Sequence, residues 1–441
     1  MCRSIRRLFA VAVIVSAGNS SVADAENYVG FRGPGSTGVA EASDLPAAWS
    51  ETENIVWKCD LPGLGASCPT IIDGKIYLTC YSGYAESIDE PGDQAKLMRH
   101  VVCVDRGTGD IVWTKDFVPK LPESNYRPDN DARHGYASST ITTDGERLYV
   151  FFGASGMYCL DMNGEEIWHV DLGSGTHGWG SGASPLLVGD MVIVNASIES
   201  KSLVALDKRT GDEIWRVGGI DSCWSTPVLV DAPERQEIVL NVPNVLKAFD
   251  PATGNELWHC QGMPDGYLVP TVTSEDGVVY VIGARKNTAA AVRAGGSGDV
   301  TDSNVLWRVN KGSNVSSPVY VDGHVYFFQE SKGIAYCLDA ATGDVVYQER
   351  LEPRPGLIYS SPLATDGKLY AVSQENGTYV LAAKPEFELL AVNKLGDADS
   401  ESIRSNASIA EADNQLFLRN DDALYCIGTV GMASAPADSA R

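Results

Sequence analysis

The sequence predicts an all-β protein, a single eight-bladed β-propeller of four-stranded antiparallel blades. A phrase of the form "ALDKRTGDEIW" (residues 205–215) recurs along the chain at intervals of about 40 to 55 residues, a period typical of propellers and solenoids. Asp-Gly pairs between short alternating apolar runs recur with it, and the runs lack helical periodicity. The 44 glycines favour many tight turns over long helices.

Each repeat contains the same succession of short strands. In residues 314–347, "SSPVYV" alternates as a strand, Asp322-Gly323 turns the chain into "HVYFFQ", and "IAYCLD" follows. Thr342-Gly343 then turns the chain into "DVVY". Asp-Gly between alternating apolar runs is a strong hairpin signal, because the primed turn requires positive φ. Four antiparallel strands per unit describe a propeller blade.

The number of repeats predicts eight blades, with seven as the alternative. Full units begin near Ser67, Ser138, Ala183, Ser225, Pro270, Ser316 and Ser360. An eighth begins near Ser405 and lacks its fourth strand, for which "ENIVWKC" (residues 53–59) supplies a candidate. We expect the N-terminal strand to close the last blade, because closure removes an open sheet edge. Residues 54–430 then provide about 47 residues per blade.

An aromatic residue ends each repeat. The tryptophans in this slot are Trp57, Trp113, Trp168, Trp215, Trp258 and Trp307. A large aromatic side chain in the outermost strand can be buried only against the next blade. We therefore interpret all six as structural docking residues, the Gly of the turn as a residue at positive φ, and the Asp as an acceptor of turn N–H groups. On the same reasoning Lys208 and Arg209 are exposed, replaceable turn residues.

The start of the chain is typical of an export signal. Three arginines lie within the first seven residues, and an apolar run (residues 8–18) and the small-x-small sequence "ADA" follow. The apolar run is shorter than the roughly 20 residues of a membrane-spanning helix. We expect a monomer exported to the periplasm or cell envelope, without a transmembrane helix in the mature chain. The expected regions are a signal peptide (1–25), an N-terminal extension (26–53), the propeller (54–430) and a disordered tail (431–441).

Composition disfavours several classes of function. A formal net charge of -24 argues against nucleic acid as a partner. Four cysteines share one slot of the repeat: Cys103, Cys159, Cys337 and Cys426. Other repeats place Ala205 or Ala248 there, which indicates small buried sites filled by free thiols. The chain has no CxxC pair, so a structural zinc site is not expected.

The repeated phrase resembles the tryptophan-docking repeat of quinoprotein alcohol dehydrogenases and of BamB-like outer-membrane assembly propellers. "FRGPGSTGV" (residues 31–39) and the following "LPAAWSETENIVWK" resemble the start of an exported PQQ-like propeller family common in planctomycetes. The resemblance covers nearly the whole mature chain. For the dehydrogenases it implies a vicinal Cys-Cys lid, a Trp under the quinone, and Glu, Asn and Asp around Ca²⁺. This chain has no adjacent cysteines and no clear ligand set, so PQQ with Ca²⁺ is unsupported and no cofactor is expected.

Loops of variable length are predicted to gather on one face of the ring, which we call the long-loop face. The short Asp-Gly and Thr-Gly turns occupy the other face, the turn face. The longest connections are residues 80–100, 114–136 and 171–183. Variable polar loops on a rigid scaffold are where recognition concentrates. We expect a protein partner or a small ligand on the long-loop face.

Candidate ligand-binding residues lie near the expected starts of inner strands and in the irregular fifth repeat (residues 283–300). They are His134, Tyr136, His177, Trp179, Trp224, Tyr267, Arg285, Arg293, Tyr359 and Arg404. Such a set suits a flat or anionic ligand through stacking and charge. The alternative is that the aromatic residues plug the channel and the histidines bond to loop backbone. No catalytic or metal-binding motif is present, so no catalytic residue or metal site is predicted.

Three functions are compatible with these features. The first is an exported, non-catalytic propeller that serves as a protein-interaction or ligand-binding scaffold. The second is a PQQ-dependent oxidoreductase with an altered site near His177 and Trp179. The third is a carbohydrate-binding propeller, which the aromatic channel mouth would serve.

Overall fold

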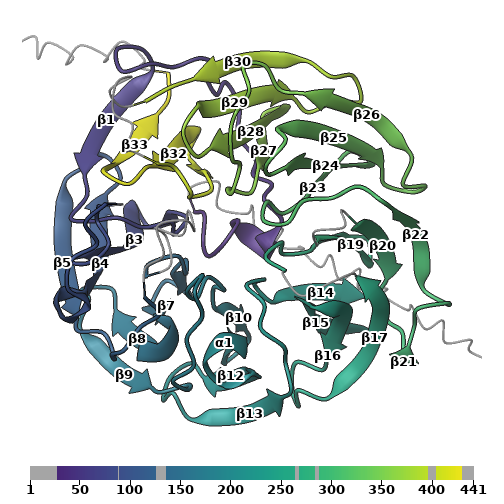
Figure 1. Ribbon diagram of the computed structural model, residues 1–441, viewed down its shortest axis with the longest axis horizontal. Coiled ribbons are helices and arrows are strands. Elements are labelled where there is room, and N and C mark those ends of the chain that lie inside the picture. The colour runs from purple at the N-terminus through teal and green to yellow at the C-terminus, as the bar shows by residue number, and fades with distance from the viewer. Residues whose placement is uncertain are drawn as a thin grey trace, which may run out of the picture.

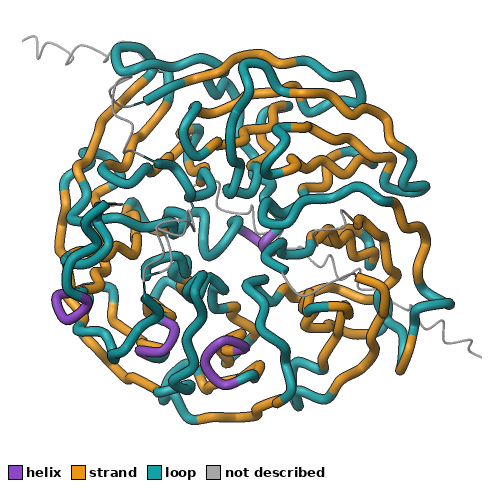
Figure 2. The backbone as a smooth tube through the Cα atoms, in the orientation of Figure 1, coloured by secondary structure: helices purple, strands orange, loops and turns teal. Residues whose placement is uncertain are grey.

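The strands of the computed structural model form eight sheets arranged in a ring (Figure 1). The structure describes residues 27–87, 89–125, 136–263, 268–283, 288–395 and 404–429. Within these residues the sheets are antiparallel apart from one parallel pair, and helices are few and short (Figure 2). The predicted all-β, eight-bladed propeller is confirmed. The expected signal peptide (1–25) and tail (431–441) lie outside the described residues.

The blades are numbered in chain order. Blade 1 consists of β2 (Thr70–Ile72), β3 (Lys75–Ser82), β4 (Met98–Asp105) and β5 (Ile111–Phe117). Blade 2 consists of β6 (Thr142–Thr143), β7 (Arg147–Phe151), β8 (Met157–Asp161) and β9 (Glu166–Val170). Blade 3 consists of β10 (Leu186–Val188), β11 (Met191–Ala196), β12 (Ser202–Asp207) and β13 (Glu213–Gly218). Blade 4 consists of β14 (Val228–Ala232), β15 (Arg235–Val242), β16 (Asn244–Phe249) and β17 (Glu256–Met263).

The remaining blades follow the same plan. Blade 5 consists of β18 (Thr273–Glu275), β19 (Val278–Gly283), β20 (Thr288–Arg293) and β22 (Val305–Val309). Blade 6 consists of β23 (Val319–Val321), β24 (His324–Gln329), β25 (Ile334–Asp339) and β26 (Val345–Arg350), and blade 7 of β27 (Leu363–Thr365), β28 (Lys368–Ser373), β29 (Gly377–Ala382) and β30 (Leu389–Asn393). Blade 8 consists of β31 (Ala410–Ala412), β32 (Gln415–Arg419), β33 (Ala423–Ile427) and β1 (Ile55–Asp60). The helices are η1 (Pro34–Ser36), η2 (Gln94–Lys96), η3 (Gly153–Ser155) and α1 (Ser197–Ser200).

The N-terminal strand closes the ring as the sequence predicts. β1 pairs antiparallel with β33, and Trp57 lies opposite Cys426. The last blade thus joins two segments from opposite ends of the propeller sequence. This pairing gives the outer edge of β33 a partner, which an isolated C-terminal hairpin would lack.

Tryptophans of the outer strands pack on turns of the following blade. The Nε1–H of Trp215 donates to the Pro251 carbonyl at 3.0 Å, and a Cβ added to Gly254 would lie 2.6 Å from the indole. Gly254 has a φ of 72°, so its turn requires both positive φ and the absence of a side chain. Equivalent bonds join Trp57 to Arg106, Trp168 to Lys208 and Trp307 to Ala340. Trp113 lies against Gly164 in the same manner.

Blade 5 departs from the repeat for a structural reason. Its connection after β20 swings outward, and β21 (Gly298–Asp299) pairs parallel with β17 of blade 4, where Gly298 lies opposite Trp258. Trp258 is fully buried, and its Nε1–H donates to the buried Glu237 carboxylate at 2.7 Å. Arg293 ends β20 and is exposed. Because β20 and β22 are joined on the turn face, Arg293 lies away from the long-loop face.

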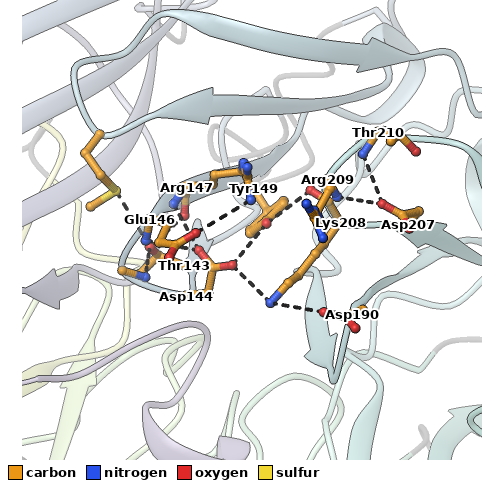
Figure 3. A network of polar contacts seen from close by, with 12 residues as sticks. Thr143, Asp144, Glu146, Arg147, Tyr149, Asp190, Asp207, Lys208, Arg209 and Thr210 are labelled. Carbon is orange, nitrogen blue, oxygen red and sulfur yellow. Dashed lines mark hydrogen bonds and ion pairs between the residues drawn. The ribbon is translucent and has the colours of Figure 1, made fainter.

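Lys208 joins two blades (Figure 3). Its Nζ lies 3.3 Å from Asp144 of blade 2 and 3.9 Å from Asp190, and its carbonyl accepts the Trp168 N–H. The Lys208 side chain is 21% exposed. Lys208 is therefore not the exposed turn residue that the sequence predicts, because its side chain lies over the neighbouring blade; that it is replaceable stays a prediction. Arg209 is exposed, and its backbone N–H donates to the Oδ1 of Asp207 in the same turn at 2.8 Å.

The nine cysteines of the described residues are buried and unpaired, which confirms the expected free thiols. Those of the repeated slot lie in the blade cores, where burial raises the pKa of the Cys159 thiol to about 12. A thiol with so high a pKa is protonated and unreactive at neutral pH. In the described part of the chain, no helix is long and apolar enough to cross a membrane.

Candidate functional site

The N-terminal extension passes through the centre of the ring. Figure 1 shows this purple segment inside the circle of blades, and Figure 2 shows its short helix η1 there. The segment pairs with blade 1 at Tyr28 and Ile71, and with blade 7 at Val39 and Ala364. Between these two anchors it contacts β14 of blade 4 through η1. We call residues 28–39 the plug.

Arg32 carries a positive charge into the middle of the plug. Its side chain hydrogen-bonds to the carbonyls of Val272 (3.4 Å), Thr37 (2.7 Å) and Pro318, which belong to blade 5, the plug itself and blade 6. Arg32 is only 1% exposed, its Nε has no hydrogen-bond partner, and no ion pair to a carboxylate is found among the described residues. Burial lowers the pKa of the guanidinium to about 10, so Arg32 remains cationic at neutral pH. A buried cation without a counter-charge is unusual.

Side-chain hydroxyls link the inner edges of the blades in a ring. In blades 1 to 7, a backbone N–H donates to a Ser or Thr hydroxyl of the next blade, at 2.9 to 3.2 Å. We call these residues the hydroxyl ring: Thr140, Ser184, Thr226, Thr271, Ser317, Ser361 and Ser408. Cys68 occupies the corresponding position of blade 1 and donates its N–H to Thr140. Each ring residue stands just before an inner strand, so the ring surrounds the channel.

A cavity of about 100 Å³ lies within the ring. Residues two positions before the ring residues form most of its wall: Ala66, Ser138, Gly182, Trp224, Val269, Val315, Tyr359 and Asn406. Five members of the hydroxyl ring line it as well: Thr226, Thr271, Ser317, Ser361 and Ser408. Phe31 of the plug and Trp179 complete the lining. We call this space the channel cavity. Its wall residues precede the inner strands and therefore lie toward the long-loop face.

Several predicted residues meet at the channel cavity. Trp179, Trp224 and Tyr359 line it. His177 contacts Trp224 edge-on, with ring centroids 4.8 Å apart. The Trp224 Nε1–H donates to the Gly180 carbonyl at 2.8 Å, which ties the loop of residues 171–183 to blade 4. The cavity is therefore bordered by a loop that hydrogen bonds hold in place.

The other predicted residues lie elsewhere. Tyr136 is buried, and its hydroxyl donates to the Ser124 carbonyl at 2.7 Å. Arg404 lies 3.9 Å from Glu375 and is not part of the cavity lining. Arg293 is on the turn face, as described above. His134, Tyr267 and Arg285 lie outside the described residues.

Val269 and Asn406 line the cavity at the positions for which the sequence predicts Tyr267 and Arg404. Most inner strands are preceded by a proline that follows the ring residue, but Pro270 stands one residue before the ring residue of its blade. Three residues before Pro270 is therefore Tyr267, which is two residues before Val269. In blade 8, Ile409 follows Ser408 in place of a proline, so no proline marks Asn406. An alignment on the recurrent Ser or Thr places Val269 and Asn406 correctly. Phe31 belongs to no repeat, and no periodic signal marks it.

A buried carboxyl group supports the loop beside the cavity. Glu199 of α1 is 5% exposed, and the Ser181 hydroxyl hydrogen-bonds to its Oε1. Its Oε2 has no partner among the described residues. Burial raises the pKa of Glu199 to about 7. The backbone carbonyl of Glu199 also accepts the Gly175 N–H at 2.9 Å, so α1 and the loop are joined twice.

The donor set of the channel cavity does not fit a quinone held by Ca²⁺. The described lining residues contribute hydroxyl, amide, indole and aliphatic groups, but no carboxylate. Protein Ca²⁺ sites use several oxygen ligands, and carboxylates supply most of the charge. No group of three or more His, Cys, Asp or Glu suited to a metal ion is found in the described residues. The lining is suited to binding by hydrogen bonds and stacking.

The repeat, the ring of eight blades and the N-terminal closure define a propeller of PQQ-like repeats. A family model described as outer membrane protein assembly factor BamB matches residues 98–299 and 296–386, more than half of the chain. The chain belongs to this family. No curated protein sequence matches it.

Solved structures share the fold at low sequence identity. BamB from Moraxella catarrhalis is 15% identical with a TM-score of 0.60, over 85% of this chain and 99% of that one. A europium-containing methanol dehydrogenase is 11% identical with a TM-score of 0.62, over 90% and 89%. A quinohemoprotein alcohol dehydrogenase from Comamonas testosteroni is 13% identical with a TM-score of 0.63, over 93% and 82%. One fold thus serves both assembly factors and dehydrogenases, and function must be argued from the site.

Proposed function

We propose that the protein is an exported, non-catalytic propeller of the cell envelope that acts as a monomeric binding scaffold through its long-loop face. The observation that carries the proposal is the channel cavity, which is lined by aromatic and hydroxyl groups and backed by the plug. Cavities of this kind, with an apolar wall and a few converging polar groups, are typical binding sites. The family match to an outer membrane assembly factor supports an envelope location.

Cross-linking from the two faces tests which one binds. Lys332 and Ala341 are exposed residues on either side of β25, on the long-loop face and the turn face respectively. A photoreactive amino acid is placed at one or the other position in living cells. We expect adducts with a partner from position 332 and not from position 341. Equal adducts from both positions, or adducts from 341 alone, would refute binding through the long-loop face.

Titration with PQQ and Ca²⁺ tests the non-catalytic part of the proposal. Trp179 and Trp224 line the cavity, so a bound quinone would change tryptophan fluorescence. We expect no such change, and no oxidation of primary alcohols with an artificial electron acceptor. Saturable quinone binding together with alcohol-dependent reduction of the acceptor would establish a quinoprotein oxidoreductase instead.

A further inference from the structure

Hydrogen-bond donors converge on one side of the channel cavity. The lining members of the hydroxyl ring come from five successive blades, 4 to 8: Thr226, Thr271, Ser317, Ser361 and Ser408. Each hydroxyl oxygen accepts a backbone N–H from the blade before it. Among the described residues none of the five hydroxyls donates to an acceptor. Since a hydroxyl carries one proton, five O–H donors remain for whatever occupies the cavity.

A positive charge lies behind two of these donors, Thr271 and Ser317. Two of the carbonyls that hold Arg32 belong to Val272 and Pro318, the residues that follow ring members Thr271 and Ser317. The inner strands run from the long-loop face toward the turn face, so the guanidinium lies one residue beneath the ring. The ring residues contribute no negative charge, and the described cavity lining holds no carboxylate. The charge of Arg32 attracts a nearby anion more strongly inside the protein than in water, because the effective dielectric constant is lower there.

The upper wall offers flat and apolar surfaces. Trp224, Val269, Val315 and Tyr359 stand above four of the five donors, and Trp179 adds a second indole. Aromatic rings bind other planar groups by stacking or edge contacts. A cavity of about 100 Å³ is smaller than the roughly 300–1,000 Å³ of pockets for drug-sized ligands. Its size suits a ligand with a single ring.

We propose that the channel cavity binds a small planar carboxylate, with its oxygens toward the hydroxyl ring and Arg32 and its ring against Trp224 and Tyr359. This inference rests on the proposed function, because it names the ligand class of the same site. A carboxylate supplies only hydrogen-bond acceptors. It therefore matches the five cavity-lining hydroxyls, which supply donors, and Arg32, which supplies a positive charge. A neutral polyol also bonds to hydroxyls, but it makes no use of the charge of Arg32.

Three probes distinguish these ligand chemistries. Benzoate is a planar carboxylate, benzyl alcohol carries the same ring without charge, and glucose is a neutral polyol. Binding to the full-length mature protein is measured by calorimetry and by the change in tryptophan fluorescence, to which Trp179 and Trp224 of the cavity wall contribute. We expect saturable binding of benzoate, binding of benzyl alcohol at least about tenfold weaker because a charge-assisted bond is lost, and no binding of glucose.

Two matched variants test the role of the cavity-lining hydroxyls of the hydroxyl ring. Thr271→Val removes a ring hydroxyl that lines the cavity, and Thr140→Val removes one that does not. Both variants lose the same kind of inter-blade hydrogen bond, so urea denaturation controls for their folding. We expect about tenfold weaker benzoate binding in Thr271→Val and unchanged binding in Thr140→Val.

Several results would overturn the inference. They are equal binding of benzoate and benzyl alcohol, tighter binding of glucose, an equal loss in both variants, or no binding of any probe. If position 332 still cross-links to a partner in cells, the scaffold function stands and only the ligand class is wrong. If the cross-linking also fails, the proposed function falls with it.

Discussion

Replacing Lys208 by methionine removes a cation that ties blade 3 to blade 2 and keeps most of the side-chain length (Figure 3). The Nζ of Lys208 lies 3.3 Å from the Oδ2 of Asp144, and the two side chains are 21% and 17% exposed. Coulomb's law at an effective dielectric constant of about 20 gives roughly 5 kcal/mol for this separation. Desolvation of both groups and ordering of the lysine chain offset most of this attraction. We expect a net loss of about 1–2 kcal/mol in the free energy of unfolding at pH 7.

The loss should depend on pH through Asp144. Burial raises the pKa of Asp144, but backbone N–H bonds from Glu146 and Arg147 and the contact with Lys208 outweigh burial and hold it below its ordinary value. A carboxyl group with a lowered pKa in the folded state stabilises the fold above its unfolded pKa and loses this effect as the pH falls. The difference between the wild type and Lys208→Met should therefore shrink toward pH 3.

Equilibrium urea denaturation at pH 7 and pH 3 measures both effects. Arg209→Met is the matched control, because Arg209 is the adjacent cation and is exposed. We expect its free energy of unfolding to lie within about 0.5 kcal/mol of the wild type. Equal effects of the two substitutions at pH 7, or a Lys208→Met effect that does not change with pH, would show that the inter-blade ion pair contributes nothing.

Further predictions concern the docking tryptophans, their turns and the buried carboxyl group. Trp215→Ala should cost about 3–5 kcal/mol of unfolding free energy. Trp215→Phe should cost less, because a phenyl ring fills part of the indole site although the bond to Pro251 is lost. Gly254→Ala should cost about 2–4 kcal/mol in urea denaturation, since its methyl group meets the Trp215 indole and its φ is positive. Gly323→Ala, at a φ of 78° with no heavy atom within 4 Å of the new methyl group, should cost only about 1 kcal/mol, and an equal cost at both glycines would contradict the docking model. The pKa of Glu199 is raised to about 7 in the folded protein, so its contribution to stability is present below its unfolded pKa and is lost as the pH rises through 7. The free energy of unfolding of Glu199→Gln should therefore fall less than that of the wild type between pH 5 and pH 8, by roughly 3 kcal/mol at most. If urea denaturation gives parallel pH profiles for the two proteins, the pKa of Glu199 is not raised.

Repetition made the architecture predictable from the amino-acid sequence. Each blade buries similar residues in a similar environment, so the pattern around Trp215 recurs and can be counted. Closure by β1 was predictable for the same reason, because Trp57 fills a slot that the last repeat lacks. The register of the inner strands was less certain, since Pro270 stands in a different relation to its strand than the other prolines. Side-chain reach was not predictable either, as Lys208 shows.

The sequence by itself determined the eight blades, their four strands, the closing strand and the free buried cysteines. These features follow from local turn chemistry and from contacts between neighbouring repeats, which periodic residues record. Only the tertiary structure decided the contents of the channel. Phe31 and Arg32 belong to a segment without repeats, and Val269 and Asn406 meet the other lining residues only when all eight blades close. A recurrent position can mark the residue that each blade contributes to the axis. Which segment fills the axis depends on contacts across the whole ring, and no repeat records those contacts.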